Sequence, residues 1–221
     1  MMIQIRRSTD RYVTESDGKR TFHSFSYGAH YDPDNIGFGP IRAVNVEQLD
    51  PGAGYEAHRH SDAEIVTWVL EGALRHTDSA GGGGVIRPGV AQRLSAGDGA
   101  EHTELNASDT EPLVFVQMML ASARTGEPEY ASIDVPSETG RLTPTVPVHA
   151  PASLHVVRFD PEQAVLVPAA PRSLVIVVAG TVLLRDELLG QGDEARLTGA
   201  GPYDLRAAGP GGHVLVWQLE S

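Results

Sequence analysis

The hydrophobic positions along this chain follow the period of β-strands. Residues 3–7, 42–49 and 214–219 alternate between apolar and polar side chains, as a strand with one buried face does. Residues 64–70 and 112–120 are nearly continuous apolar runs that contain β-branched and aromatic side chains, which is typical of buried strands. No segment keeps a helical period over three turns. The pattern predicts an all-β protein with few helices.

Turn-forming residues divide these strands at short intervals. The chain has 24 glycines and 15 prolines among 221 residues, which favours many turns and short strands. Glu71-Gly72 predicts a hairpin after the strand at 64–70, and Ala179-Gly180 predicts a similar hairpin in the second half. This repeated outline predicts two small β-barrels.

A stretch with a weak apolar pattern separates the two predicted barrels. It is rich in Pro, Ser, Thr and Glu, as connecting segments are. We therefore expect an N-terminal metal-binding domain at 1–125, a connection at 126–152 and a C-terminal domain without a metal site at 153–221.

Charge and composition narrow the range of partners. Lysine and arginine number 17 and aspartate and glutamate 29, so the net charge of −12 disfavours direct binding to nucleic acid or anionic membrane. The absence of cysteine excludes thiolate catalysis, thiolate metal sites and disulfides. No apolar run of the roughly 18 residues that a membrane span needs is present, and the N-terminus lacks the pattern of a signal peptide. We expect a soluble, cytoplasmic protein.

Two short motifs suggest a metal site. His58-Arg59-His60 and His102-Thr103-Glu104 each place two donor side chains two residues apart. On a strand such residues share a face, so two strands of one barrel could direct all four donors at one point. Three imidazoles and one carboxylate suit a first-row transition metal. Because they must bind as neutral imidazoles and an ionised carboxylate, binding is expected to weaken as the pH falls through the histidine range.

The spacing alone is weak, because His30-Tyr31-Asp32 and His76-Thr77-Asp78 have the same form. We expect His76 and Asp78 to be a surface pair on a hairpin rather than a second metal site. His23 and His30 are candidates for the mouth of the barrel or for ordinary packing. Asn106 either orients a ligand or stabilises a turn.

The surrounding residues form a longer series that is more specific. In chain order it comprises Phe22-His23-Ser24-Phe25, Tyr31-Asp32-Pro33, residues 37–45, residues 54–60, residues 64–72, His76-Thr77-Asp78-Ser79, Pro88-Gly89 and residues 95–106. The series resembles the pirin-like bicupin family, in particular its bacterial members similar to quercetin 2,3-dioxygenase. The resemblance covers roughly residues 20–120; beyond them it rests on strand order and β pattern.

The resemblance implies two cupin barrels of the jelly-roll, or double-stranded β-helix, type with one metal in the N-terminal barrel. Its ligands map to His58, His60, His102 and Glu104. Such donors suit Fe, Mn, Co, Ni, Cu or Zn, so the expected cofactor is one divalent transition metal of unspecified identity. Glu64 lies one residue farther from Gly72 than the acidic ligand of ordinary cupins would, which argues against Glu64 as the carboxylate ligand.

The resemblance also implies a reaction. Some members of the family open the ring of a flavonol with dioxygen, so the expected partners are a small, flavonol-like aromatic substrate and O2. Glu104 would then be the catalytic residue, a general base for the 3-hydroxyl of the substrate. The alternative is a non-enzymatic metal- or redox-sensing protein that acts through a protein partner. A third reading is a metal-dependent isomerase or hydrolase, because a fold does not determine a function.

Overall fold

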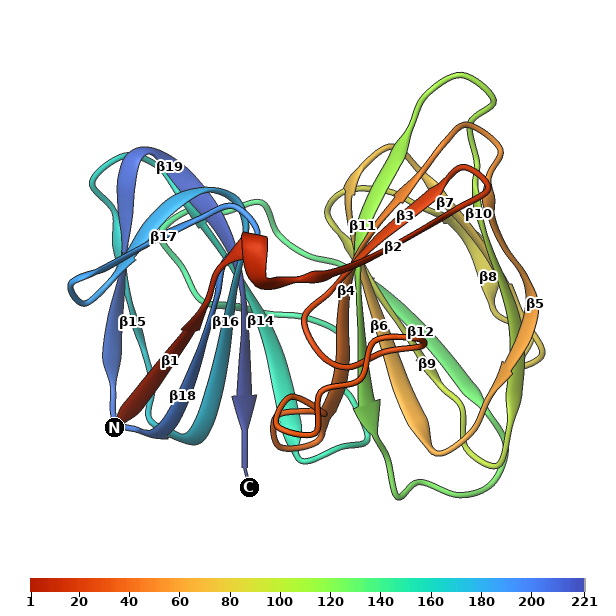
Figure 1. Cartoon of the computed structure of the whole chain (residues 1–221), viewed down its shortest axis with the longest axis horizontal. Helices are drawn as coiled ribbons and strands as arrows, with labels where there is room; N and C mark the ends of the chain where they lie inside the picture. The colour runs from red at the N-terminus through yellow and green to blue at the C-terminus, as the bar shows by residue number, and fades with distance from the viewer. Residues whose placement is uncertain (221) are drawn as a thin grey trace. The chain divides into compact units, whose positions relative to one another are not determined.

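The structure, a computed structural model, describes residues 1–220 and is built almost entirely of β-strands (Figure 1). Within these residues the only helix is a single 3-10 turn, η1 (Ser8–Asp10), so no helix has the length and hydrophobicity to cross a membrane. The all-β fold predicted from the sequence is confirmed.

The chain divides into two compact units. The N-terminal unit comprises Arg11–Asp134 and Val146–Ala150, and the C-terminal unit comprises Met1–Asp10, Val135–Thr145 and the chain from Pro151 onward. The first ten residues, which the sequence analysis placed with the N-terminal domain, thus lie in the C-terminal unit. There β1 (Met2–Arg6) pairs antiparallel with β18 (Glu194–Ala200).

The N-terminal unit consists of two sheets. Its seven-stranded sheet has the order β12-β9-β6-β11-β4-β3-β2, and its four-stranded sheet has the order β5-β10-β7-β8. The strands of the first sheet are β2 (Tyr12–Ser16), β3 (Lys19–His23), β4 (Ile41–Leu49), β6 (Ala63–Glu71), β9 (Val90–Ser95), β11 (Leu113–Ala121) and β12 (Glu129–Asp134). Those of the second are β5 (Gly54–His60), β7 (Leu74–Asp78), β8 (Gly83–Ile86) and β10 (Ala100–Asn106). The two sheets are not joined into a closed barrel by hydrogen bonds.

Apolar residues form separate buried clusters in the N-terminal unit. One buried cluster contains Leu49, Val69, Leu74, Ile86, Leu113 and Phe115. Another contains Ile65, Leu94, Ala96 and Ala100. Buried polar side chains, among them His76, His102 and Glu104, also belong to this unit. Because burying such groups costs free energy unless they find partners, their concentration marks a functional region.

The C-terminal unit has one eight-stranded sheet and an apolar core. The order is β1-β18-β16-β19-β14-β13, with β15 paired to β19 and β17 paired to β16. The remaining strands are β13 (Thr143–Pro144), β14 (Ala152–Phe159), β15 (Ala164–Val167), β16 (Ala170–Leu184), β17 (Glu187–Gly190) and β19 (Tyr203–Leu219). Its buried cluster includes Val157, Val175, Val177, Val214 and Val216, alternate positions of three neighbouring strands.

Candidate metal centre

The four-stranded sheet brings the histidine motifs together on one face. In the antiparallel register, His102 of β10 lies opposite His58 of β5 and opposite Asp78 of β7. Glu104 lies opposite His76. Directly paired residues share a face of a sheet, as do residues two apart on one strand. The inner face therefore carries the predicted donors and also the His76–Asp78 pair.

Three of the predicted donors form a tight cluster. The ring centroids of His58 and His102 are 4.3 Å apart, and the ring of His60 lies 5.0 Å from each of them. One nitrogen of each ring lies within 4.8 Å of one nitrogen of the others. A divalent ion such as Zn2+ binds imidazole nitrogens at about 2.0–2.1 Å. Small side-chain movements would bring the three nitrogens to this distance from a common point.

Glu104 belongs to a second group of donors. Its carboxylate forms this group with His76 and His102, again with donor atoms within 4.8 Å of one another, and all three residues are buried. Gln117 of β11 donates its side-chain amide to both Glu104 oxygens, at 2.9 and 2.7 Å. His102 is thus the member that the two groups share.

Hydrogen bonds determine the tautomer of His58. Its Nδ1 lies 2.8 Å from the backbone carbonyl of Glu56. A carbonyl oxygen only accepts, so Nδ1 carries the proton and Nε2 carries the free lone pair. An imidazole whose other nitrogen donates to a carbonyl is a common arrangement in metal-binding histidines.

His102 is buried without a hydrogen-bond partner on either ring nitrogen. Burial, together with the neighbouring His58, His60 and His76, lowers the pKa of His102 to about 3. The ring is therefore neutral at physiological pH and keeps a lone pair. A buried imidazole with unused nitrogens beside two more imidazoles and a carboxylate fits a divalent transition metal.

The carboxyl of Glu104 has an unusual pKa. Burial raises the pKa of Glu104 to about 7, opposed by the hydrogen bonds from Gln117 and assisted by the charge of Glu47. In the metal-free protein a proton therefore competes with a cation for this group near neutral pH. A carboxyl that titrates near pH 7 also suits general acid–base chemistry.

A chamber of about 290 Å³ opens above these donors. His58, His60 and Glu104 of the four-stranded sheet line it, and Glu47 and Gln117 of the seven-stranded sheet face them. The volume lies at the lower end of the roughly 300–1,000 Å³ range of small-molecule sites. The two sheets therefore enclose a space that accommodates one small ligand beside the candidate metal donors.

A hydrogen-bonded carboxyl lies on the wall opposite the histidines. Glu47 accepts from the hydroxyls of Thr21, at 2.5 Å, and Tyr55, at 2.7 Å. Burial raises the pKa of Glu47, and burial and the charge of Glu47 raise that of Tyr55. Tyr27, which stacks on His23 with ring centroids 5.1 Å apart, also lines the chamber and gives it an aromatic side.

Comparison with known proteins identifies the family. The pirin family model matches residues 6–120. A Mycobacterium tuberculosis H37Rv protein, Rv0181c, with the provisional name quercetin 2,3-dioxygenase, is 41% identical over 99% of this chain and 96% of its own. The chain belongs to the pirin family. The quercetin 2,3-dioxygenase of Escherichia coli K12 is 36% identical to this pirin over 57% of the chain and 54% of its own length.

Solved structures agree with this family membership. The crystal structure of YhhW from Escherichia coli matches with a TM-score of 0.92 and 27% identity, over 99% of this chain and 97% of that one. A second structure of YhhW, described as a bacterial pirin in complex with nickel(II), matches with a TM-score of 0.91 over 99% of both chains. The bicupin fold implied by the sequence resemblance is thus confirmed.

The structure corrects the position of the His76–Asp78 pair. The sequence analysis expected a surface pair, but the side chains of His76 and Asp78 are 1% and 0% exposed and hydrogen-bonded at 2.8 Å. The ring of His76 also stacks on Tyr130, with centroids 5.3 Å apart. This pair has the same i, i+2 spacing as the two metal-site motifs. The sequence alone could not show whether that spacing was significant or due to chance.

The remaining candidates divide between the chamber and the scaffold. His23 lines the chamber, whereas His30 stacks on Tyr12 and bonds to Thr14. Asn106 donates to the backbone carbonyls of Leu49, Asp50 and Glu111, so it stabilises turns.

Glu64 lies away from the chamber. The register pairs Thr67, three residues farther along β6, with the chamber-lining Gln117, so strand alternation turns Glu64 to the opposite face. There it is fully buried and accepts from Ser95 and Ser122 at 2.7 and 3.0 Å. The structure therefore supports its exclusion from the candidate ligands.

Sequence reasoning did not identify Gln117 or Glu47. Gln117 interrupts the apolar residues of β11, and Glu47 is a buried charged residue within β4. Such an interruption is a usable signal, because a buried polar side chain needs a partner. The identity of that partner depends on how two sheets face each other, which a single sequence does not give.

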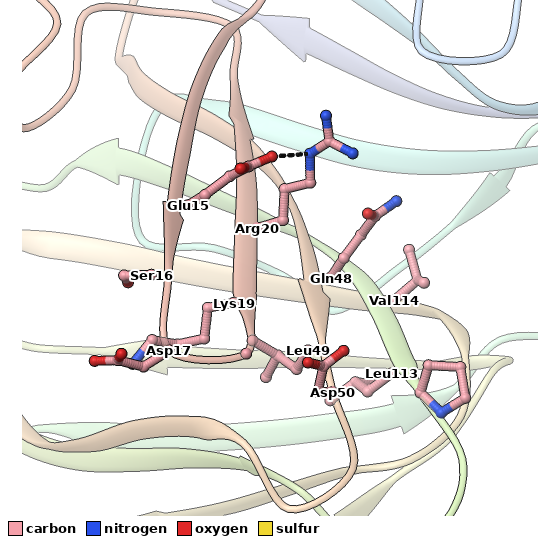
Figure 2. A pocket seen from close by; sticks show the side chains of 12 residues that line it. Glu15, Ser16, Asp17, Lys19, Arg20, Gln48, Leu49, Asp50, Leu113 and Val114 are labelled. Atoms are coloured by element: carbon pink, nitrogen blue, oxygen red, sulfur yellow. Dashed lines mark ion pairs between the residues drawn. The ribbon is translucent and has the colours of Figure 1, made fainter.

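A larger cavity, of about 650 Å³, lies at the β2–β3 turn and the start of β11 (Figure 2). Its lining is charged: Glu15 pairs with Arg20 at 2.8 Å, and Asp17, Lys19 and Asp50 are also present. None of the candidate donors lines this cavity, so it lies outside the candidate metal centre.

Proposed function

We propose that this pirin is a metal-dependent dioxygenase of the quercetin 2,3-dioxygenase type, which opens a flavonol ring with O2. His58, His60, His102 and Glu104 would hold one divalent transition metal. The observation that carries the proposal is the cluster of three imidazoles together with a carboxyl of pKa about 7, since two of these imidazoles and the carboxyl line a chamber of about 290 Å³. The names of the mycobacterial and Escherichia coli relatives support the reaction class.

Each chain residue has a definite task in this proposal. Glu104 accepts the proton of the flavonol 3-hydroxyl, for which a pKa near the working pH is favourable. Gln117 holds the Glu104 carboxylate in place through its two hydrogen bonds. Tyr27 offers a ring face to the aromatic substrate. The metal, when bound, supplies positive charge that stabilises the deprotonated 3-hydroxyl oxygen. The products would be a depside and carbon monoxide.

The test compares metal-loaded protein with and without quercetin. Samples loaded separately with Fe2+, Mn2+, Co2+, Ni2+, Cu2+ or Zn2+ are mixed with quercetin first under anaerobic and then under aerobic conditions. We expect a red shift of the quercetin spectrum on binding, from its deprotonation, and dioxygen uptake on aeration with at least one metal.

Two variants of β10 sharpen the test. Glu104→Gln removes the base, so turnover should fall about 10²–10⁴-fold and bound quercetin should remain protonated. Glu101→Gln is the matched control, because Glu101 is one strand position from His102 but exposed on the outer face. If Glu104→Gln, loaded with metal, turns over like the wild type, Glu104 is not the base. If the wild type binds metal but neither shifts the quercetin spectrum nor consumes O2, a non-enzymatic metal- or redox-sensing role through a protein partner becomes the better proposal.

A further inference from the structure

His76 has a free lone pair that no interaction of the protein uses. Its Nε2 lies 2.8 Å from Oδ2 of Asp78, whose other oxygen accepts from the backbone amides of Ala80 and Gly82 at 2.8 and 2.9 Å. Carboxylate oxygens accept hydrogen bonds, so in this contact Nε2 of His76 donates and carries the proton. The lone pair of His76 is then on Nδ1.

This Nδ1 is buried and has no hydrogen-bond partner. An unsatisfied buried nitrogen costs free energy, about 1–3 kcal/mol, unless something absent from the protein itself binds it. One ring nitrogen of His76 belongs to a group with donor atoms of His102 and Glu104 that all lie within 4.8 Å of one another, and the ring centroids of His76 and His102 are 5.4 Å apart. The His76 ring therefore lies beside two other donors of metal-binding type.

We propose that the N-terminal unit contains a second cation position, formed by Nδ1 of His76 together with His102 and Glu104. Two imidazoles and one carboxylate are a sufficient protein ligand set for a divalent transition metal with open coordination positions. All three members are buried, whereas His58 and His60 are partly exposed to the chamber. We call the His76–His102–Glu104 set the inner position, and the set of the proposed function, His58–His60–His102–Glu104, the outer position.

The inner position has the supporting contacts of a built metal site. Asp78 orients His76, which reproduces the carboxylate–histidine–metal arrangement found in many metalloproteins. Gln117 orients Glu104 through bonds to both carboxylate oxygens. Tyr130 stacks on the His76 ring and restricts its rotation. Each of these contacts holds a donor in place before any ion arrives.

The two positions exclude each other. A neutral imidazole has one lone pair, so His102 can bind an ion in only one of them at a time. The proposal therefore retains one ion per chain and adds His76 to its donors. It rests on the metal binding assumed in the proposed function, and it is independent of the substrate.

The two sets can be separated by mutation. In His58→Ala/His60→Ala the outer position is lost and the inner donors remain. Calorimetric titration of the metal-free full-length variant with Ni2+ or Co2+ should still show one ion per chain, bound more weakly than in the wild type. Adding His76→Phe should abolish the remaining binding, because phenylalanine keeps the stacking on Tyr130 but lacks Nδ1. The visible spectrum of Co2+ gives a second readout that does not depend on activity.

Thr77→Val is the matched control in the same background, since Thr77 lies between His76 and Asp78 and points to the opposite face, where it bonds to Thr103. It should leave binding unchanged. Circular dichroism of each metal-free variant checks that it folds; should His76→Phe not fold, His76→Leu replaces it. If the wild type binds one ion and the His58→Ala/His60→Ala variant binds none, the inner position is overturned and the proposed function remains intact. Equal binding with and without His76 also overturns it. A wild type that binds no divalent metal overturns both proposals.

Discussion

The side-chain amide of Gln117 bonds to both carboxylate oxygens of Glu104, at 2.9 and 2.7 Å, across the space between the two sheets of the N-terminal unit. The same carboxyl has its pKa raised by burial to about 7. Gln117 thus opposes the effect of burial, because a hydrogen bond to the charged form favours ionisation. The ionisation of Glu104, and with it the affinity for a cation, therefore depends on this contact as well as on burial.

Gln117→Leu should therefore weaken metal binding. Loss of the two hydrogen bonds raises the pKa of Glu104 further and frees its carboxyl to rotate, and removal of such a supporting residue typically costs about 10–100-fold in metal affinity. Calorimetric titration with Ni2+ at pH 7.5 measures the change. Gln48→Leu, at an exposed position of β4, is the control and should bind as the wild type does. Equal affinities in the two variants would show that Gln117 does not support the centre.

The pH dependence of metal binding should follow Glu104 first. The pKa of His102 is lowered to about 3, so this ring stays neutral where Glu104, with a pKa of about 7, takes up a proton; burial also lowers the pKa of His60. Affinity for Ni2+ should fall by about tenfold per pH unit below pH 7, the slope for competition with one proton. In Glu104→Gln the slope between pH 7 and 6 should be smaller. An identical slope in both proteins would assign the competing proton to another group.

The stability of the metal-free protein should depend on the same carboxyl. The folded-state pKa of Glu104 is raised from 4.5 to about 7, so the folded protein binds more protons than the unfolded chain between these values. Stability that is fully present below pH 4.5 is therefore lost as the pH rises to 7, by up to about 3 kcal/mol at about 1.4 kcal/mol per pKa unit.

Glu104→Gln does not titrate, so it should gain stability relative to the wild type over this pH range. Urea unfolding in the presence of a chelator, at pH 4.5, 6 and 7.5, measures the difference. Glu101→Gln, on the exposed face of β10, should show no such trend. A constant difference between Glu104→Gln and the wild type at all three pH values would contradict the raised pKa.

The sequence predicted the strands well because their signal is local. The alternation in residues 42–49 and the apolar run at 64–70 correspond to β4 and β6. The i, i+2 spacing correctly placed His58 with His60 and His102 with Glu104 on shared faces, and the register brought the two pairs to one sheet face. These inferences need only the period of a strand.

The contacts between sheets were beyond the sequence. The period of a strand does not show that Gln117 of β11 meets Glu104 of β10, because the two belong to different sheets. Nor did it distinguish the buried His76–Asp78 pair from the equally spaced His30 and Asp32. The hairpin position of His76 suggested solvent exposure, but Tyr130 of β12 covers its ring. Both features depend on residues far apart in the chain.

The last prediction concerns Glu64, the buried carboxylate that does not face the chamber. Besides Ser95 and Ser122 it accepts from the backbone amide of His149 at 3.2 Å, and it lies 3.9 Å from Arg93. It therefore connects the strand β6 with residues 146–150 inside the N-terminal unit. Removing it leaves the buried Ser95 hydroxyl without its acceptor, whereas Arg93 keeps its contacts with Glu129 and with the carbonyl of Pro147.

Glu64→Ala should destabilise the N-terminal unit by about 1–3 kcal/mol, the usual cost of leaving a buried hydrogen-bonding group unsatisfied. Trp68 belongs to this unit and Trp217 to the other, so tryptophan fluorescence in a Trp217→Phe background follows the unit by itself during urea unfolding. Glu71→Ala, exposed at the end of the same strand, is the control and should change stability by less than about 0.5 kcal/mol. Hydrogen exchange at the His149 amide should accelerate in Glu64→Ala, since that amide loses its acceptor. The folded variant should still bind one divalent ion, because Glu64 lies on the face opposite the donors; loss of the ion with the fold intact would instead place Glu64 in the centre.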